Sequence, residues 1–417
     1  MPEISKNKAF LPYGCQTIEE DDIAAITKAM RADFLTAGPM VGQFETEFAD
    51  VVGARYARSC SSGTAALHLA MLALDIGPND TVIVPSMTFL ASANAVRFVG
   101  AKVLFSDVDP DTGLIGPSQL EEALARADSA SVKAVVVVHI NGQCADMVGI
   151  TKIARKHSLK IIEDACHALG AAHNTEHEHE HEHEHEHEQV PVGACALSDI
   201  TCFSLHPVKM LTTAEGGMAT TNNLEFAERL ALLRNHGMNR DSETFQNREQ
   251  AFDTEGAANP WYYEMNEIGY NYRLPDLLCA LGCSQLNKLD RFVEQRRQLA
   301  AAYKQLLQPL SPIIKSVPDV NWSTHAYHLF VSLIDFDALE LSRAQMMVRL
   351  REQGIGTQVH YLPVHRQPYY QREYGIEGLT GADTYYSKCL SLPLYPSMNM
   401  ADVERVCTAL LALTATK

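Results

Sequence analysis

The sequence predicts an α/β domain built on a mostly parallel sheet, followed by a smaller α+β domain. From about residue 60 to residue 240, short β-branched runs alternate with longer stretches of helical pattern. Such runs are typical of strands that are covered on both faces by the helices between them. After about residue 275 the pattern changes to a long helix followed by mixed strands and helices. We therefore assign residues 1–275 to a large domain and residues 276–417 to a small domain.

Six apolar, β-branched runs predict the strands of the large domain: Thr81–Pro85, Lys102–Phe105, Lys133–His139, Leu159–Glu163, Ile200–Ser204 and Met218–Thr221. Helical spacing predicts three of the helices between them: Ala65–Leu74, Ser118–Ala127 and Met147–His157. The turns after these strands are rich in Gly, Pro, Asp and His. Because ligands bind at the carboxyl edge of such sheets, we expect a site there.

The small domain begins with a long helical pattern from Pro275 to Leu307, whose leucines and Phe292 share one apolar face. The pattern then predicts, in order, two strands and two helices: strand Ala326–Ile334, helix Arg343–Gln353, strand Gly356–Tyr361 and helix Met400–Leu413. This mixture is typical of an α+β unit.

The composition excludes several classes of protein. A net charge of −17 argues against nucleic acid as a partner, because phosphate backbones attract Lys and Arg. No stretch approaches the ~20 continuous apolar residues that span a bilayer, and residues 1–6 lack the apolar run of a signal peptide. Several of the ten cysteines lie singly in apolar or turn segments, as reduced thiols do. We therefore expect a soluble, cytoplasmic protein with no membrane contact.

Residues 174–189 form a low-complexity insert in which Glu and His alternate from Glu176 to Glu188. The tract has no apolar side chain to bury and repels itself, which predicts a mobile loop. Alternating His also offers imidazoles to a transition metal. We expect no biological metal site there, and an engineered insertion is a further interpretation.

The first segment with a chemical signature is Ser61–Ala66, at the start of an apolar helix. Small residues let the backbone approach an anion, and the free N–H groups and dipole of a helix N-terminus favour a phosphate. The same residues also suit an ordinary N-cap, so this segment alone leaves both interpretations open.

The second segment is Ile161–Gly170, where Glu163 and Asp164 end a buried strand. A buried carboxylate is costly unless a cation pairs with it. A pyridinium nitrogen could be that cation, since a carboxylate keeps it protonated and lets the ring accept electrons. A strand-end cap or a structural ion pair fits the residues equally well.

The third segment runs from Phe203 to Met218 and contains Lys209 just past a strand end, beside Pro207 and before a Gly-Gly turn. A lysine held in such a loop can form a Schiff base with an aldehyde cofactor and move a proton on carbon. A surface lysine is the alternative. The chain order favours catalysis, because a phosphate turn, a strand-end Asp and a Lys about 45 residues later lie on one α/β sheet.

With these segments in this order, the sequence resembles the DegT/DnrJ/EryC1/StrS sugar aminotransferases. The resemblance covers the chain from about Pro12 to the C-terminal helix. It depends on segments that occur in the order of the family: SSGTAALHLA, VPSMTFLASANAV, DVDPDTG, EDACHALGA, DITCFSLHPVKMLTTAEGG, LRNHG and GYNYRLPD. It implies the fold of type I pyridoxal 5′-phosphate (PLP)-dependent transferases, like aspartate aminotransferase, with a seven-stranded sheet and PLP as cofactor.

The resemblance implies three catalytic residues. Lys209 would form the Schiff base with PLP, Asp164 would pair with the pyridinium nitrogen, and His167 would lie beside the cofactor. From the residues alone, His167 could instead be a satisfied core histidine. Some members of the family carry His in place of the lysine and dehydrate sugars, so Lys209 favours transamination.

Five further residues would bind the cofactor. The resemblance implies that Phe89 stacks on the ring and that Gly63, Thr64 and Ser204 bind the phosphate. Asn271 would reach the phosphate of the other subunit, which implies a homodimer with shared active sites. Taken without the resemblance, Phe89 would be a core residue and Asn271 a turn residue.

The insert at 174–189 departs from the family, whose members have a short turn between the Asp164 strand and the Lys209 strand. Two competing functions remain. A non-enzymatic PLP-fold regulator would not need both Lys209 and Asp164. Another PLP reaction, such as elimination or dehydration, fits the same fold.

Within the family, the segments Pro260–Met265 and Gly356–His365 look most like the pseudaminic acid branch. That branch moves an amino group from L-glutamate to C4 of UDP-2-acetamido-2,6-dideoxy-β-L-arabino-hexos-4-ulose. Aromatic and His side chains can stack on uracil and bond to sugar hydroxyls. Relatives in the legionaminic acid and bacillosamine routes have similar motifs, so another UDP-linked keto-sugar is the alternative substrate.

Overall fold

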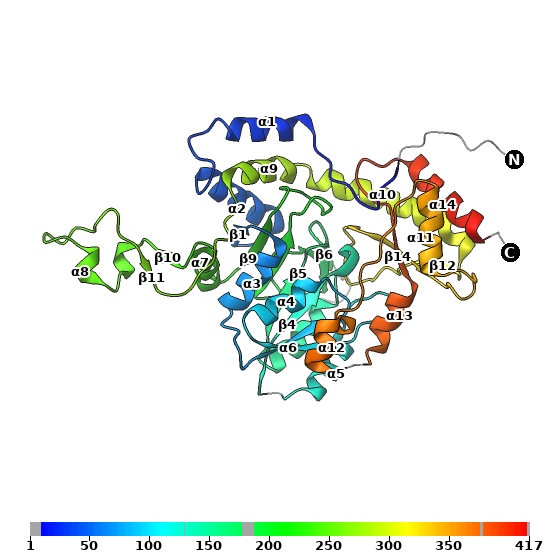
Figure 1. Ribbon diagram of the computed structural model, residues 1–417, viewed down its shortest axis with the longest axis horizontal. Helices are drawn as coiled ribbons and strands as arrows, with labels where there is room; N and C mark the ends of the chain where they lie inside the picture. Colours follow the sequence, from blue (N-terminus) through cyan, green and yellow to red (C-terminus); the bar gives the residue numbers. More distant parts are fainter. Residues whose placement is uncertain (1–9, 129, 177–186, 376–377, 415–417) are drawn as a thin grey trace, which may run out of the picture.

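A seven-stranded sheet forms the centre of the protein in the computed structural model, which describes residues 10–128, 130–176, 187–375 and 378–414 (Figure 1). Its strands are β1 (Tyr56–Cys60), β2 (Thr81–Pro85), β3 (Lys102–Ser106), β4 (Val132–Val138), β5 (Lys160–Asp164), β8 (Ile200–Ser204) and β9 (Gly217–Thr221). The strand order is β1-β9-β8-β5-β4-β2-β3. Neighbours from β3 to β8 are parallel, and β9 is antiparallel to both β1 and β8.

The mostly parallel sheet is confirmed, and every strand predicted for the large domain forms to within one residue at each end. The strand β1 and several helices were not predicted. The helices of this part are α1 (Glu20–Ala29), α2 (Pro39–Val52), α3 (Gly63–Ala73), α4 (Leu90–Phe98), α5 (Pro117–Arg126), α6 (Met147–Lys156) and α7 (Leu224–Leu233).

Two apolar cores lie against the sheet where β8 and β9 meet. Successive side chains of a strand point to opposite faces. Accordingly, Cys202 and Ala219 are buried in one core, and their neighbours Phe203 and Met218 are buried in the other. The first core continues into α3, α4, α5 and α6, whereas the second continues into α2 and α9 (Asp276–Leu286). Burial on both faces explains the continuous apolar runs in the sequence.

The C-terminal part packs around a third core and a three-stranded antiparallel sheet of order β12-β13-β14. The long predicted helix divides near Asn287 into α9 and α10 (Leu289–Leu307). The remaining elements are β12 (Ile314–Ser316), β13 (Phe330–Ile334), α11 (Arg343–Glu352), α12 (Pro368–Tyr374), α13 (Thr380–Lys388), β14 (Cys389–Leu392) and α14 (Met400–Thr414).

Two predictions for this part are wrong. Gly356–Tyr361 is not a strand, because only one isolated bridge, between Gln358 and Ser391, joins it to a neighbour. The segment instead contributes residues 358–361 to the wall of a cavity. The strand predicted at Ala326–Ile334 begins only at Phe330, and the residues before it bond to the loop at Asn141 and Gly142.

The ends of the predicted low-complexity loop 174–189 are ordered as strands. β6 (Ala172–Glu176) pairs antiparallel with β7 (His187–Pro191). The prediction of a loop therefore fails at residues 174–176 and 187–189. Its central part, residues 177–186, lies outside the described residues.

A slender arm extends from the body of the protein between α7 and α9 (Figure 1, green). It contains β10 (Met238–Asn239), α8 (Arg248–Ala251) and β11 (Glu264–Met265), with β10 and β11 paired antiparallel. Glu264 anchors the arm internally by accepting the N–H groups of Gln246 and Asn247 and the hydroxyl of Tyr262.

All ten cysteines are free thiols. Among the described helices, none combines the length and the apolar character that crossing a membrane requires.

Glu163 forms a buried polar network behind the sheet. Its carboxylate is bound by His139 at 2.7 Å and His173 at 3.2 Å, and it accepts the hydroxyls of Ser198 and Thr201. Burial alone would raise the pKa of Glu163, but the two histidines hold it well below its ordinary value. Burial would lower the pKa of His173, yet Cys144 and Glu163 raise it to about 10. The network therefore contains a buried ion pair.

The same cluster brings three potential metal-ligand atoms within 4.8 Å of one another, one each from His139, Glu163 and His173. These atoms are already hydrogen-bonded to each other. The Nδ1 atom of His139 also accepts the N–H of Ala145, which leaves its proton on Nε2 and directs that proton to Glu163. The cluster is thus satisfied as a hydrogen-bonded network that holds the end of β5.

We expect Glu163→Gln to lower the free energy of unfolding by about 3–5 kcal/mol at pH 6, because it leaves the His173 imidazolium buried without a counter-charge. The stabilisation from Glu163 is present above its unfolded pKa and is lost as the pH falls through its lowered folded pKa. The contribution of His173 is complete below its unfolded pKa and is lost as the pH rises towards about 10.

Urea unfolding at pH 6 and pH 9.5 measures this difference. The loss should be smaller at pH 9.5 than at pH 6, and Glu294→Gln, at an exposed position on α10, should cost little at either pH. A loss that does not change with pH would contradict the ion pair.

Candidate active site

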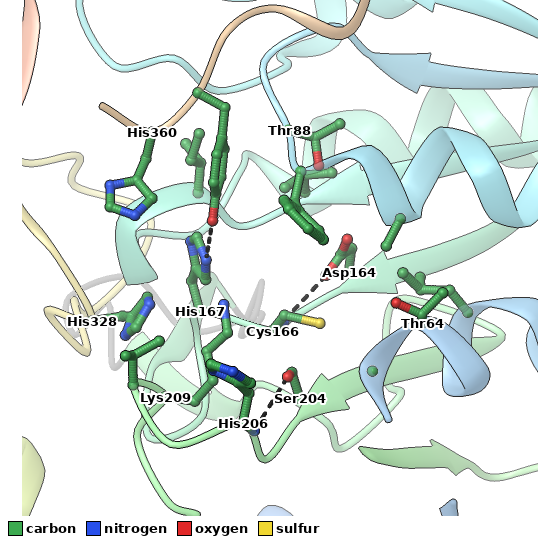
Figure 2. A pocket seen from close by; sticks show the side chains of 18 of the residues that line it. Thr64, Thr88, Asp164, Cys166, His167, Ser204, His206, Lys209, His328 and His360 are labelled. Carbon is green, nitrogen blue, oxygen red and sulfur yellow. Dashed lines mark hydrogen bonds between the residues drawn. The ribbon is translucent and has the colours of Figure 1, made fainter. Parts of the chain in front are cut away.

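A cavity of about 480 Å³ opens at the carboxyl edge of the sheet (Figure 2). Its floor is formed by the ends of β5 and β8, which are adjacent parallel strands. The first turn of α3 and the start of α4 form one side. Residues 358–361, which follow α11 in the chain, form the opposite wall. Segments distant in sequence thus meet over the strand ends.

Asp164 is the last residue of β5 and is buried in the cavity floor. One carboxylate oxygen accepts the Ser92 hydroxyl at 2.6 Å, and the other accepts the N–H of Cys166 at 3.2 Å. The Ser92 hydroxyl also lies 2.7 Å from that of Thr88. These contacts fix the orientation of the carboxylate. Its negative charge faces the cavity and can accept a hydrogen bond from a cationic group of a ligand.

Lys209 lies in the loop between β8 and β9 and lines the same cavity. Its N–H donates to the carbonyl of His206, and Leu205 bonds to Gly216 and Thr213, which closes the loop. Burial lowers the pKa of Lys209, and Cys166 and Asp164 only partly offset this effect. A lowered pKa increases the fraction of neutral amine, the form that attacks an aldehyde.

The first turn of α3 forms one end of the cavity. The hydroxyl of Ser62 caps the helix by accepting the N–H of Ala65. The N–H groups of Gly63 and Thr64 have no acceptor within the helix, so they are available to an anion. A Cβ atom at Gly63 would lie 2.8 Å from Cβ of Ser204, so only glycine lets the helix approach β8 this closely.

His167 is buried beside Lys209 and makes two hydrogen bonds. Its Nδ1 atom accepts the N–H of Asn141 at 3.3 Å, and its Nε2 atom lies 3.1 Å from the Tyr361 hydroxyl. Burial, together with Lys209 and His360, holds the pKa of His167 well below its ordinary value. The ring is therefore neutral at physiological pH.

Phe89 is the residue before α4, and its ring is 52% exposed because it faces the cavity rather than the core. The interpretation of Phe89 as a core residue is therefore wrong. Its ring centroid lies 5.6 Å from that of Tyr361. An exposed aromatic face on the cavity wall can stack on a planar ligand.

The structure brings seven of the eight candidate residues into one cavity: Gly63, Thr64, Phe89, Asp164, His167, Ser204 and Lys209. Asn271 is exposed outside the cavity, where it pairs with Asn235. Sequence reasoning missed several lining residues from distant segments: Tyr13, Thr88, His328, His360 and Tyr361. The motif VPSMTFLASANAV indicated the region of Thr88, but not the hydrogen bonds that link Thr88 to Ser92 and Ser92 to Asp164.

The cavity fits PLP. Unsatisfied N–H groups of α3 and the hydroxyls of Thr64 and Ser204 suit a phosphate, and the close packing at Gly63 keeps them together. A buried anion at Asp164 suits a pyridinium nitrogen, and the lysine of lowered pKa suits an aldehyde. Fold and cavity together define a PLP-dependent transferase of the aspartate aminotransferase type.

Comparison with known proteins gives the family. The sequence profile of the DegT/DnrJ/EryC1/StrS aminotransferase family matches residues 16–411. The chain is 37% identical over 410 residues to the spore coat polysaccharide biosynthesis protein SpsC of Bacillus subtilis, covering 97% of each chain. It is 34% identical to the UDP-4-amino-4-deoxy-L-arabinose–oxoglutarate aminotransferase of Shewanella sediminis, covering 98% of this chain and 99% of that protein.

Among solved structures, the fold is similar to Helicobacter pylori PseC, an aminotransferase involved in the biosynthesis of pseudoaminic acid. The TM-score is 0.84 at 25% identity, over 98% of this chain and 100% of that chain. The chain belongs to the DegT/DnrJ/EryC1/StrS aminotransferase family. It is a sugar aminotransferase whose cofactor is PLP.

We expect Gly63→Ala to weaken PLP binding by about tenfold or more, since the added Cβ forces the start of α3 away from Ser204 and Cys166. Titration of the apoenzyme with PLP, followed by absorption, gives the Kd. Gly42→Ala is the matched control, because a Cβ there meets nothing within 4 Å. An unchanged Kd in a folded Gly63→Ala variant would refute the phosphate site.

Proposed function

We propose that the protein transfers an amino group from L-glutamate to the C4 keto group of a UDP-linked 4-keto-6-deoxy-hexosamine. The observation that supports this proposal most strongly is the convergence of Lys209, Asp164 and the α3 N-terminus on one cavity. The Shewanella relative is named for a UDP-4-amino sugar and oxoglutarate, and PseC for pseudoaminic acid. Both names describe amino-sugar chemistry, in line with the segments Pro260–Met265 and Gly356–His365.

In the proposed reaction, Lys209 would hold PLP through its amine and would accept and return the proton of the substrate carbon. Its lowered pKa suits both tasks, because the neutral amine is the nucleophile and the base. Asp164 would pair with the ring nitrogen and favour its protonated form. When bound, PLP supplies an electron sink for the carbon that loses or gains the proton. Phe89 and His167 hold the ring, and Gly63, Thr64 and Ser204 hold the phosphate.

We propose UDP-2-acetamido-2,6-dideoxy-β-L-arabino-hexos-4-ulose as the acceptor, in a pseudaminic acid route in the cytoplasm. The name of SpsC refers instead to the polysaccharide of a spore coat, so a related keto-sugar is the second candidate. Acceptors of the bacillosamine and legionaminic acid routes belong to the same chemical class. A dehydratase is disfavoured because a lysine, and not a histidine, occupies the loop at 209. A non-catalytic regulator is disfavoured because it would not need both Lys209 and Asp164, and both side chains line the cavity.

We also propose a homodimer with shared active sites. Asn271 cannot serve the cavity of its own protomer, because it is exposed outside it. Trp261 and Ile268, on the arm that leads to Asn271, are 74% and 75% exposed. Large apolar side chains grouped on a protruding arm are typical of a surface that a partner covers. A second copy would bury them and receive Asn271 at its cofactor phosphate.

We expect Lys209→Ala to reduce turnover by about three orders of magnitude or more while the fold stays intact. In the wild-type protein loaded with PLP, L-glutamate should deplete the visible absorption band of the bound cofactor, and one UDP-4-keto-sugar should restore it. Lys315→Ala, at an exposed lysine paired with Asp111, is the control and should behave as wild type. Normal turnover in Lys209→Ala, or a band indifferent to glutamate, would contradict the proposal.

Subunit complementation tests the shared site. Mixing Lys209→Ala with Asn271→Ala should restore about a quarter of the wild-type activity, because random dimers regain one intact site in each mixed pair. Each variant alone should be impaired. If Asn271 served its own protomer, each site of the mixed dimer would keep one defect and mixing would restore nothing.

A further inference from the structure

The side chain of Tyr361 lines the cavity, and its hydroxyl is not among the groups that hold the cofactor or move the proton in the proposed reaction. Tyr361 lines the cavity together with Lys209 and His167. It follows α11 in the chain, whereas His167 follows β5. The hydrogen bond between the two side chains, marked by the dashed line at His167 in Figure 2, joins the wall to the floor.

The backbone at Asn141 sets the direction of this hydrogen bond. Asn141 donates its N–H to Nδ1 of His167 at 3.3 Å, so that nitrogen carries no proton. Burial, Lys209 and His360 keep the pKa of His167 well below its ordinary value. A neutral ring with a free Nδ1 lone pair carries its one proton on Nε2. Nε2 therefore donates to the Tyr361 oxygen, 3.1 Å away.

The proton of the Tyr361 hydroxyl is consequently left for another acceptor. Burial holds the pKa of Tyr361 well above its ordinary value, so the hydroxyl keeps its proton. Within the part of the chain that the structure describes, His167 is the single hydrogen-bond partner of this hydroxyl. Because the hydroxyl lines the cavity, its proton is available to an acceptor that a ligand supplies.

Three other polar groups of the cavity already have proposed tasks. Thr64 and Ser204 lie at the α3 end, with the proposed phosphate. Asp164 already accepts the Ser92 hydroxyl and the Cys166 N–H, and its proposed task is to pair with the ring nitrogen. Tyr361 offers an O–H donor beside His167, in the cavity that Lys209 also lines and where the substrate carbon must react.

We propose that Tyr361 donates a hydrogen bond to the carbonyl oxygen of the keto substrate, with His167 as the positioning residue that orients it. When an amine adds to a carbonyl, negative charge grows on the oxygen, and a pre-oriented donor stabilises that charge. The assignment rests on the proposed aminotransfer, but it applies to any keto substrate, including 2-oxoglutarate. It thereby makes Tyr361 a further catalytic residue.

Tyr361→Phe removes only the hydroxyl and tests the assignment. The holoenzyme is loaded with pyridoxamine 5′-phosphate and mixed with 2-oxoglutarate in a single turnover followed by cofactor absorption. We expect the maximal rate constant to fall by about 10²-fold, as for other oxyanion donors, with little change in half-saturation. Tyr369→Phe, at a surface tyrosine of α12, should retain the wild-type rate constant.

Two further readouts separate the alternatives. The pH titration of the cofactor absorption without substrate should be the same in Tyr361→Phe and wild type. A shifted titration would show that the hydroxyl serves the cofactor instead, and a rate constant within twofold of wild type would show that it serves neither; both results would overturn the assignment. Because 2-oxoglutarate replaces the sugar, failure of every keto-sugar with the wild-type enzyme would refute the proposed acceptor without touching this test.

Discussion

The buried carboxylate of Asp164 is the constraint on which the rest of the site depends. A negative charge at the end of a central strand is tolerated only if its oxygens are bonded and a cation is near. Ser92 and the N–H of Cys166 satisfy the oxygens, and Lys209 lies near enough for the carboxylate to oppose the lowering of its pKa. Asp164 thus links α4, which carries Ser92, to the end of β5, and it faces the cavity that Lys209 also lines.

The sheet topology turns this constraint into a site. Because β5 and β8 are adjacent and parallel, Asp164 and Ser204 end at the same edge, and the loop after Ser204 returns Lys209 towards Asp164. The N-terminus of α3 meets this edge through Gly63, which packs on Ser204. The opposite face of β5 is held by Glu163 and its histidines. One strand end thus carries two carboxylates with separate tasks.

Much of this arrangement could be predicted from the sequence. Continuous β-branched runs marked six of the seven strands of the central sheet to within one residue, whereas β1, with sequence YARSC, has no such run. Asp164, Lys209 and Gly63 each belong to a local motif at a strand or helix end. The resemblance to a known family then linked these motifs to one cofactor.

The remaining residues of the cavity could not be predicted, because contacts between distant segments bring them there and local sequence patterns do not encode such contacts. Tyr361 meets His167 across 194 positions of the chain, and its segment reads as a strand although it forms a wall. Phe89 looks like a core residue because the residues around it are apolar. The boundary at 275/276 stays a prediction, as do the roles of the site residues and the dimer.

Borohydride reduction of the PLP-loaded protein, followed by peptide mapping with mass spectrometry, tests directly whether Lys209 is the lysine that binds the cofactor. Reduction turns a Schiff base between a lysine and PLP into a stable adduct, which marks the lysine. We expect a single adduct, at Lys209. An adduct at another lysine, or a fully loaded protein that gives no adduct, would contradict it.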